Sequence, residues 1–163
     1  SYHRHMTRLK NQGCDVAYYH DEIGYNYRLE GLQGAVLSVS LKYLPGWTAR
    51  RQEIGRRYER EITNPLIQMQ VHPGNTETVF HLFVIQVEER DRFIQYMADA
   101  DVECHRHYPV PCHLQKAYAH LGYGRGDCPN AERLAERCVT LPLFPEMRED
   151  EIARVIELCN GFR

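Results

Sequence analysis

The stretch Val79–Val87 has the sequence VFHLFVIQV and is aromatic, β-branched and nearly continuous in apolar character. A run of this length and composition is typical of a β-strand covered on both faces. A short helix is expected after it, around Asp91–Ala98, and then a brief strand at Val102–His105. Further on, Val139–Pro142 (VTLP) is predicted to form an edge strand, because proline cannot join a central ladder.

Helical spacing dominates the rest of the chain. From Leu32 onward, apolar residues recur on one helical face, and Pro45 and Gly46 are predicted to end that helix. A second helix is expected from about Thr48 until Asn64 and Pro65 stop it. Shorter helices are predicted at about 2–11, before Leu121 with Gly122 as the left-handed cap, from 129 to about 138, and over 149–160, where Gly161 is expected to close the last one.

These elements predict an α+β fold with a small, mainly antiparallel sheet packed with helices, and a single domain over residues 1–163. The composition, 43% apolar and 26% charged, is that of an ordinary globular protein. The net charge of −2 gives no reason to expect nucleic acid binding, and no apolar run approaches the ~20 residues of a membrane span. Six scattered cysteines without a CxxC motif favour reduced thiols and a cytoplasmic location. Because the chain opens with Ser1, we expect further residues upstream.

The densest group of chemically active side chains is CHRHY at Cys104–Tyr108, followed by Cys112 and His113. Cysteine and histidine are zinc ligands, but these spacings match no zinc module. The segment is also compatible with a purely structural loop. The interpretation we favour is a loop that contacts substrate, because Pro109 and Pro111 restrict the backbone and so hold neighbouring side chains at low entropic cost.

Several motifs, in order, resemble one known family. They are GYNYR at 24–28, LQGA at 32–35, Arg51 and Tyr58, HYPVPCHLQKAY at 107–118, LGY at 121–123, GDCP at 126–129, AE at 131–132 and LPLFPE at 141–146. This order is similar to the C-terminal part of DegT/StrS-type nucleotide-sugar aminotransferases, which depend on pyridoxal 5'-phosphate (PLP). The resemblance covers nearly the whole chain.

The resemblance implies the C-terminal, small domain of a fold-type I PLP-dependent transferase, with residues 1–30 as a connecting helix and interface loop. Family members are homodimers with active sites at the subunit interface. By similarity, Asn26 would bind the PLP phosphate of the partner subunit. Arg28, His107, Tyr108 and, at the pocket edge, His113 would bind substrate.

The chain departs from the family pattern in one way that decides its own activity. Its lysines are Lys10, Lys42 and Lys116, and none has the serine-rich, glycine-followed setting of the family's cofactor lysine. We therefore expect no catalytic residue and no metal ligand in this chain. Gln12 and Gly34 also replace the usual histidine and alanine.

Three hypotheses follow. The first is a fragment of an aminotransferase that moves an amino group from an amino acid donor, expected to be glutamate, to a nucleotide-linked keto sugar. The second is a sugar dehydratase of the same fold. The third is a non-catalytic binding module. No membrane or nucleic acid partner is expected in any of them.

Overall fold

The structure, a computed structural model, describes all residues from Ser1 to Arg163. The chain divides into two compact units, Ser1–Pro45 and Gly46–Arg163. The sequence suggested one domain with residues 1–30 as its connecting part, whereas the boundary between the compact units falls at Pro45. None of the helices combines the length and the apolarity needed to cross a bilayer.

The helix α2 extends without interruption over Gly31–Glu61 and contains Pro45 in its interior. The prediction of two helices separated by Pro45 and Gly46 is therefore wrong. Proline costs a helix interior about 3 kcal/mol, because it lacks the amide hydrogen and crowds the preceding turn. Helix formers precede it at Leu41 and Lys42 and resume at Ala49–Gln52 after three weaker ones, and the helix continues through the proline.

The first unit contains α1 (Tyr2–Lys10), a long loop and the first half of α2. The loop returns to the end of α1 through an isolated β-bridge between Asn11 and Asn26. Gly13 makes this return possible. Its φ is +78°, and a Cβ atom there would lie 1.7 Å from the carbonyl oxygen of Glu22.

The second unit is built on a three-stranded antiparallel sheet in the order β1-β2-β3, formed by Ile67–Gln68, Phe83–Val87 and Cys138–Leu141. Phe83 pairs with Leu141, and Ile67 pairs with Val87. The predicted edge position of the strand before Pro142 is confirmed. The two-residue strand β1 was not predicted, because so short a segment carries no detectable periodicity.

The regular part of the predicted strand Val79–Val87 begins only at Phe83, and it is fully buried on one face, not on both as predicted, because Val84 and Gln86 are half-buried. Phe80 has φ +46°, outside the β region, and its ring lies against Gly55 of α2, where an added Cβ would come within 2.5 Å of it. Arg51 hydrogen-bonds the carbonyl oxygens of Phe80 and His81. Contacts with α2 therefore replace strand pairing over residues 79–82.

The remaining elements are α3 (Arg90–Ala98), two 3-10 helices η1 (Cys112–Leu114) and η2 (Lys116–Leu121), α4 (Pro129–Arg137) and α5 (Glu149–Gly161). Gly122 is left-handed, with φ +77°, as predicted. The helix expected before it is split at Gln115, which is extended. The expected strand at 102–105 is reduced to a bridge between His105 and Thr140. The last helix, α5, ends at Gly161, where the sequence placed its end, and Phe162 follows in an extended conformation.

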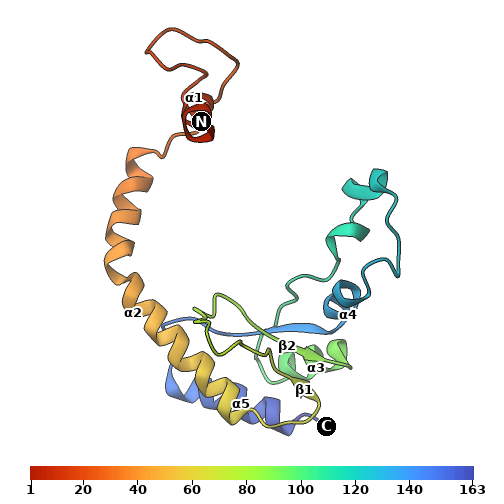
Figure 1. Ribbon diagram of the computed structural model, residues 1–163. Helices are drawn as coiled ribbons and strands as arrows, with labels where there is room; N and C mark the ends of the chain where they lie inside the picture. The colour runs from red at the N-terminus through yellow and green to blue at the C-terminus, as the bar shows by residue number, and fades with distance from the viewer. The chain divides into compact units, whose positions relative to one another are not determined.

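The core of the second unit lies between the sheet and three helices. Side chains of α2, α3 and α5 pack on alternate residues of β2, whose Phe83, Ile85 and Val87 are buried. Figure 1 shows α5 beside the C-terminal half of α2, and the amide of Asn64 just after α2 donates to the Cys159 carbonyl of α5 at 2.8 Å. The predicted α+β class with a small antiparallel sheet is confirmed.

Candidate active-site segments

The GYNYR segment is attached by its backbone to the end of α1. The amide of Tyr25 donates to the carbonyl of Leu9 at 2.6 Å, and the amide of Tyr27 donates to that of Lys10 at 2.9 Å. The rings of Tyr25 and Tyr27 stack with centroids 5.0 Å apart. Asn26, which lies between them, is exposed. The loop thus presents Asn26 on a fixed backbone.

Arg28 is placed to orient the Asn26 side chain. Its Nε donates to Asn26 Oδ1 at 3.1 Å, and its Nη1 donates to Asn11 Oδ1 at 3.2 Å. An amide group offers one acceptor and two donor hydrogens. Because the guanidinium occupies the acceptor of Asn26, the two amide hydrogens remain as its outward-facing polar groups.

His107 lies in the second unit and is anchored through one ring nitrogen. Its Nδ1 is 2.8 Å from the hydroxyl oxygen of Thr140 on β3. Tyr108 is largely exposed, and its ring makes an edge-on contact with the His107 ring at 5.2 Å between centroids. The structure therefore places these two predicted substrate residues together, while Arg106 turns away to pair with Asp91 at 2.9 Å.

His113 has a different environment from His107. Its Nε2 lies 3.0 Å from Glu132 Oε1, and both side chains are largely buried. The same carboxylate accepts hydrogen bonds from the amides of Gly126 and Cys128. Burial alone would raise the pKa of Glu132, but the hydrogen bonds from Gly126, His113 and Cys128 outweigh it and lower the pKa. In this structure His113 links η1 to Glu132 of α4, and Glu132 in turn holds the glycine-containing loop before that helix.

A cavity of about 600 Å³ opens beside His107 in the second unit. Its apolar wall comes from β2, β3 and the residues after β3. Its polar groups include the imidazoles of His81, His105 and His107, with Asp150, Glu151 and Arg154 of α5. A mixed lining of this kind is typical of small-molecule sites. His113 does not line it.

Two residues of α2 hold the wall of this cavity in place. The buried phenol of Tyr58 donates to the carbonyl of Pro142 at 2.9 Å, and Arg51 donates to that of Leu143 at 3.0 Å. Burial raises the pKa of the Tyr58 phenol above its usual value, so it remains a neutral donor. The motif residues Arg51 and Tyr58 therefore support the backbone that follows β3.

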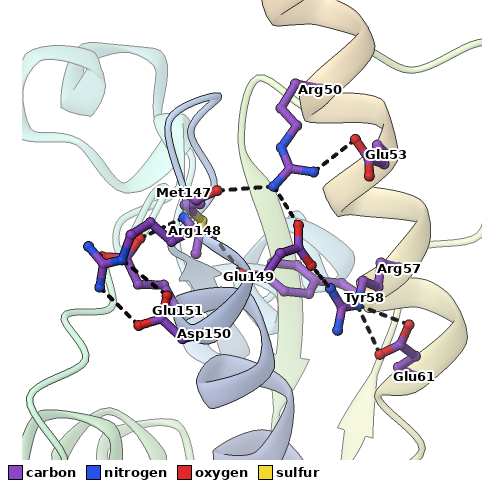
Figure 2. A network of polar contacts seen from close by, with 10 residues as sticks. All are labelled: Arg50, Glu53, Arg57, Tyr58, Glu61, Met147, Arg148, Glu149, Asp150 and Glu151. Carbon is purple, nitrogen blue, oxygen red and sulfur yellow. Dashed lines mark hydrogen bonds and ion pairs between the residues drawn. The ribbon is translucent and has the colours of Figure 1, made fainter.

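A network of charged side chains fixes the start of α5, which forms the other side of the cavity. Figure 2 shows Glu149 reaching the guanidinium groups of both Arg50 and Arg57. Arg50 also donates to the carbonyl of Met147 at 3.0 Å. The two guanidinium groups lower the pKa of Glu149. Glu149 thereby joins α5 to α2.

Cys104 and the three lysines lie in settings that give no sign of a reactive centre. Burial raises the pKa of Cys104 to about 12, so this thiol is protonated at neutral pH. No three His, Cys, Asp or Glu side chains come together in a way that could hold a metal ion. Lys10, Lys42 and Lys116 are all exposed and lie in separate elements. Asn26 offers hydrogen-bond donors that suit a phosphate, and none of the three lysines lies in a pocket.

Thr140 and Asn11 were missed by the sequence reasoning. Asn11 carries no local signal, because its contact with Arg28 spans 17 positions. Thr140 does carry one: it is a polar residue in the middle of a short apolar strand, between Val139 and Leu141. Such a residue is buried only when its hydroxyl has a partner.

Comparison with known proteins identifies the family. The family model described as the DegT/DnrJ/EryC1/StrS aminotransferase family matches residues 1–160. The chain is 37% identical over 157 residues to a dTDP-3-amino-3,6-dideoxy-alpha-D-galactopyranose transaminase of Aneurinibacillus thermoaerophilus, covering 96% of this chain and 43% of that protein. It is 34% identical to a dTDP-3-amino-3,4,6-trideoxy-alpha-D-glucose transaminase of Streptomyces venezuelae, covering 93% of this chain and 40% of that protein.

The solved structures agree with the sequence comparison. DesV of S. venezuelae, solved in complex with a ketimine intermediate, superposes with a TM-score of 0.90 at 33% identity, covering 94% of this chain and 42% of that one. An aminotransferase from Brucella abortus gives a TM-score of 0.88 at 26% identity, covering 96% and 42%. The chain thus spans about two fifths of the length of the relatives it matches. By both sequence and fold, it belongs to the DegT/DnrJ/EryC1/StrS aminotransferase family.

Proposed function

We propose that this chain is the C-terminal part of a PLP-dependent aminotransferase that acts on a nucleotide-linked keto sugar. The observation that carries the proposal is the family match over residues 1–160, which includes every segment described above. The names of two relatives, both transaminases of dTDP-3-amino sugars, favour a 3-keto sugar linked to dTDP. Glutamate is the proposed amino donor, and the proposed location is the cytoplasm.

The proposed assembly is a homodimer, in which each subunit completes the site of the other. Asn26 would donate its amide hydrogens to the phosphate of the PLP bound in the partner subunit. The contact of Arg28 with Asn26 Oδ1 supports this role, because it leaves the donor side of the amide facing outward. Arg28 keeps a further nitrogen, Nη2, for a substrate anion. PLP, when bound, acts as an electron sink for the exchange of the amino group.

His107 and Tyr108 would bind the sugar nucleotide. The support is that His107 lines a cavity large enough for a small ligand and that its ring uses Nδ1, not Nε2, for its one hydrogen bond, to Thr140. Tyr108 is exposed beside it and offers a phenol to a hydroxyl or phosphate oxygen. His113 is proposed to act at the pocket edge. It would do so indirectly, by holding Glu132, which in turn holds the loop at Gly126 and Cys128.

Isotope transfer tests this function and separates the alternatives. The full-length polypeptide containing this chain is incubated with PLP, ¹⁵N-glutamate and a dTDP-linked 3-keto-6-deoxy sugar, and the products are analysed by mass spectrometry. Formation of a ¹⁵N-amino sugar together with 2-oxoglutarate supports the aminotransferase. Loss of water from a sugar without nitrogen incorporation would identify the dehydratase. Sugar-nucleotide binding without any conversion would identify a non-catalytic module.

A further inference from the structure

Thr140 is the one polar residue among the buried residues of the core, with 5% of its surface exposed. Its backbone is already fully used: its amide donates to the carbonyl of His105 at 2.8 Å, and its carbonyl accepts from the amide of His105 at 3.1 Å. On its other side it pairs with Val84 of β2. The backbone of Thr140 is therefore fixed on both sides, which fixes the point from which its side chain extends.

This hydroxyl has a single partner, which is Nδ1 of His107 at 2.8 Å. A buried hydroxyl without a hydrogen bond would be destabilising, so the contact with His107 explains how a polar side chain is accommodated at this point of the strand. Valine would fit the same space and suits a β-strand at least as well. The fold alone therefore gives no reason for a hydroxyl here.

We propose that Thr140 is a positioning residue that orients the imidazole of His107 toward the sugar nucleotide. This inference rests on the proposed function for the identity of the ligand. The bond at Nδ1 fixes the plane of the ring, while Nε2 has no partner within the chain and His107 lines the 600 Å³ cavity. Nε2 is consequently the ring nitrogen that meets the ligand.

The chemistry of a hydroxyl makes this partner different from a carboxylate or a carbonyl. A carboxylate at Nδ1 accepts a hydrogen bond and so leaves Nε2 of a neutral imidazole as an acceptor. A threonine hydroxyl can donate or accept. It holds the ring in one orientation while allowing Nε2 either to donate to a sugar oxygen or to accept from a sugar hydroxyl.

The test is Thr140→Val, with Thr140→Ser as the conservative variant, in the full-length enzyme. Thr63→Val is the matched control, because Thr63 is exposed and its hydroxyl makes no hydrogen bond in the chain. We expect Thr140→Val to raise KM for the sugar nucleotide about three- to tenfold, the effect of losing one neutral hydrogen bond, with kcat and the KM for glutamate changed less than twofold. Thr140→Ser should remain within twofold of the unchanged enzyme, and the melting temperature of Thr140→Val should not fall.

A double variant distinguishes positioning from general damage. If Thr140 acts through His107, Thr140→Val should have no further effect on KM in a His107→Gln background. Additive effects, or a failure of Thr140→Ser to restore KM, would overturn the proposal.

A spectroscopic measurement keeps the inference independent of the proposed function. The ¹⁵N ring resonances of His107, assigned by their loss in His107→Gln, report which nitrogen carries the hydrogen and how Nδ1 is bonded. They should shift in Thr140→Val and stay in place in Thr140→Ser and Thr63→Val. Should the protein lack aminotransferase activity while these shifts occur, the proposed function fails and the positioning role stands. Unchanged resonances in Thr140→Val would refute the positioning role itself.

Discussion

Replacing Tyr58 with phenylalanine removes one oxygen from the core and tests how α2 supports the cavity wall. The side chain is fully buried, its ring makes an edge-on contact with Phe83 at 5.1 Å, and its hydroxyl donates to the carbonyl of Pro142 at 2.9 Å. Phenylalanine retains the ring contact. The variant therefore isolates the hydrogen bond and leaves the Pro142 carbonyl without its donor.

The magnitude follows from that geometry. A typical neutral hydrogen bond contributes about 0.5–1.5 kcal/mol net, and leaving a buried acceptor unpaired costs about 1–3 kcal/mol. Since Pro142 itself is only half-buried, we expect Tyr58→Phe to lower the free energy of unfolding by about 1–2 kcal/mol. For a protein of this size, that corresponds to a fall in melting temperature of about 3–6 °C.

Urea unfolding followed by circular dichroism and by the fluorescence of Trp47 measures this difference. The slope against urea should stay constant, because the fold is unchanged. Burial keeps the Tyr58 phenol protonated, so the difference should be the same at pH 6 and pH 9. Tyr123→Phe is the control, since that ring is exposed. If Tyr58→Phe is no less stable than Tyr123→Phe, the reasoning about the Pro142 contact is refuted.

Two further predictions concern charged side chains of the second unit, Arg51 and Glu132. Arg51→Met should lower the free energy of unfolding by about 2–4 kcal/mol, because charge-assisted hydrogen bonds to three backbone carbonyls are lost. In the same urea assay, the control Arg56→Met, at an exposed position, should change the free energy of unfolding by less than about 0.5 kcal/mol. Glu132→Gln should be less stable than the unchanged protein at neutral pH, and the gap should close only below the ordinary pKa of glutamate. The folded pKa of Glu132 is lowered, so its ionised form contributes stability above its unfolded pKa, and that contribution is lost as the pH falls through the lowered folded value. A gap that is already absent at pH 6 would contradict this assignment.

The element types were largely predictable because most elements carry their own signals. The apolar run around Ile85, the left-handed glycine at 122 and the helix expected over 149–160 each correspond to an observed feature. The errors arise where a distant contact decides the conformation. Residues 79–82 have strand composition, yet Arg51 and Gly55 of α2 bind that segment in a non-strand form. Pro45 signals a break, but its neighbours carry the helix through it.

For the site, sequence motifs identified the segments more readily than the contacts. GYNYR and HYP were recognised as units, whereas the partner of each central residue lies far away in the chain. His107 is oriented by Thr140, and Arg28 is held by Asn11. His113 lies close to His107 in sequence and yet pairs with Glu132, because η1 directs it toward the first turn of α4. Such pairings depend on tertiary structure, which no local pattern contains.

The central claim, that Asn26 completes the PLP site of a partner subunit, is tested most directly by mixed dimers. Losing one donor to the phosphate should weaken PLP binding, measured by equilibrium dialysis, about ten- to a hundredfold. One dimer combines an Asn26→Ala chain that keeps the cofactor lysine with a chain lacking that lysine. The other dimer carries both changes on the same chain. The account predicts normal PLP affinity and activity in the first dimer, whose lysine-bearing pocket receives a normal asparagine, and weak PLP binding in the second. Equal PLP affinity in the two dimers would contradict it.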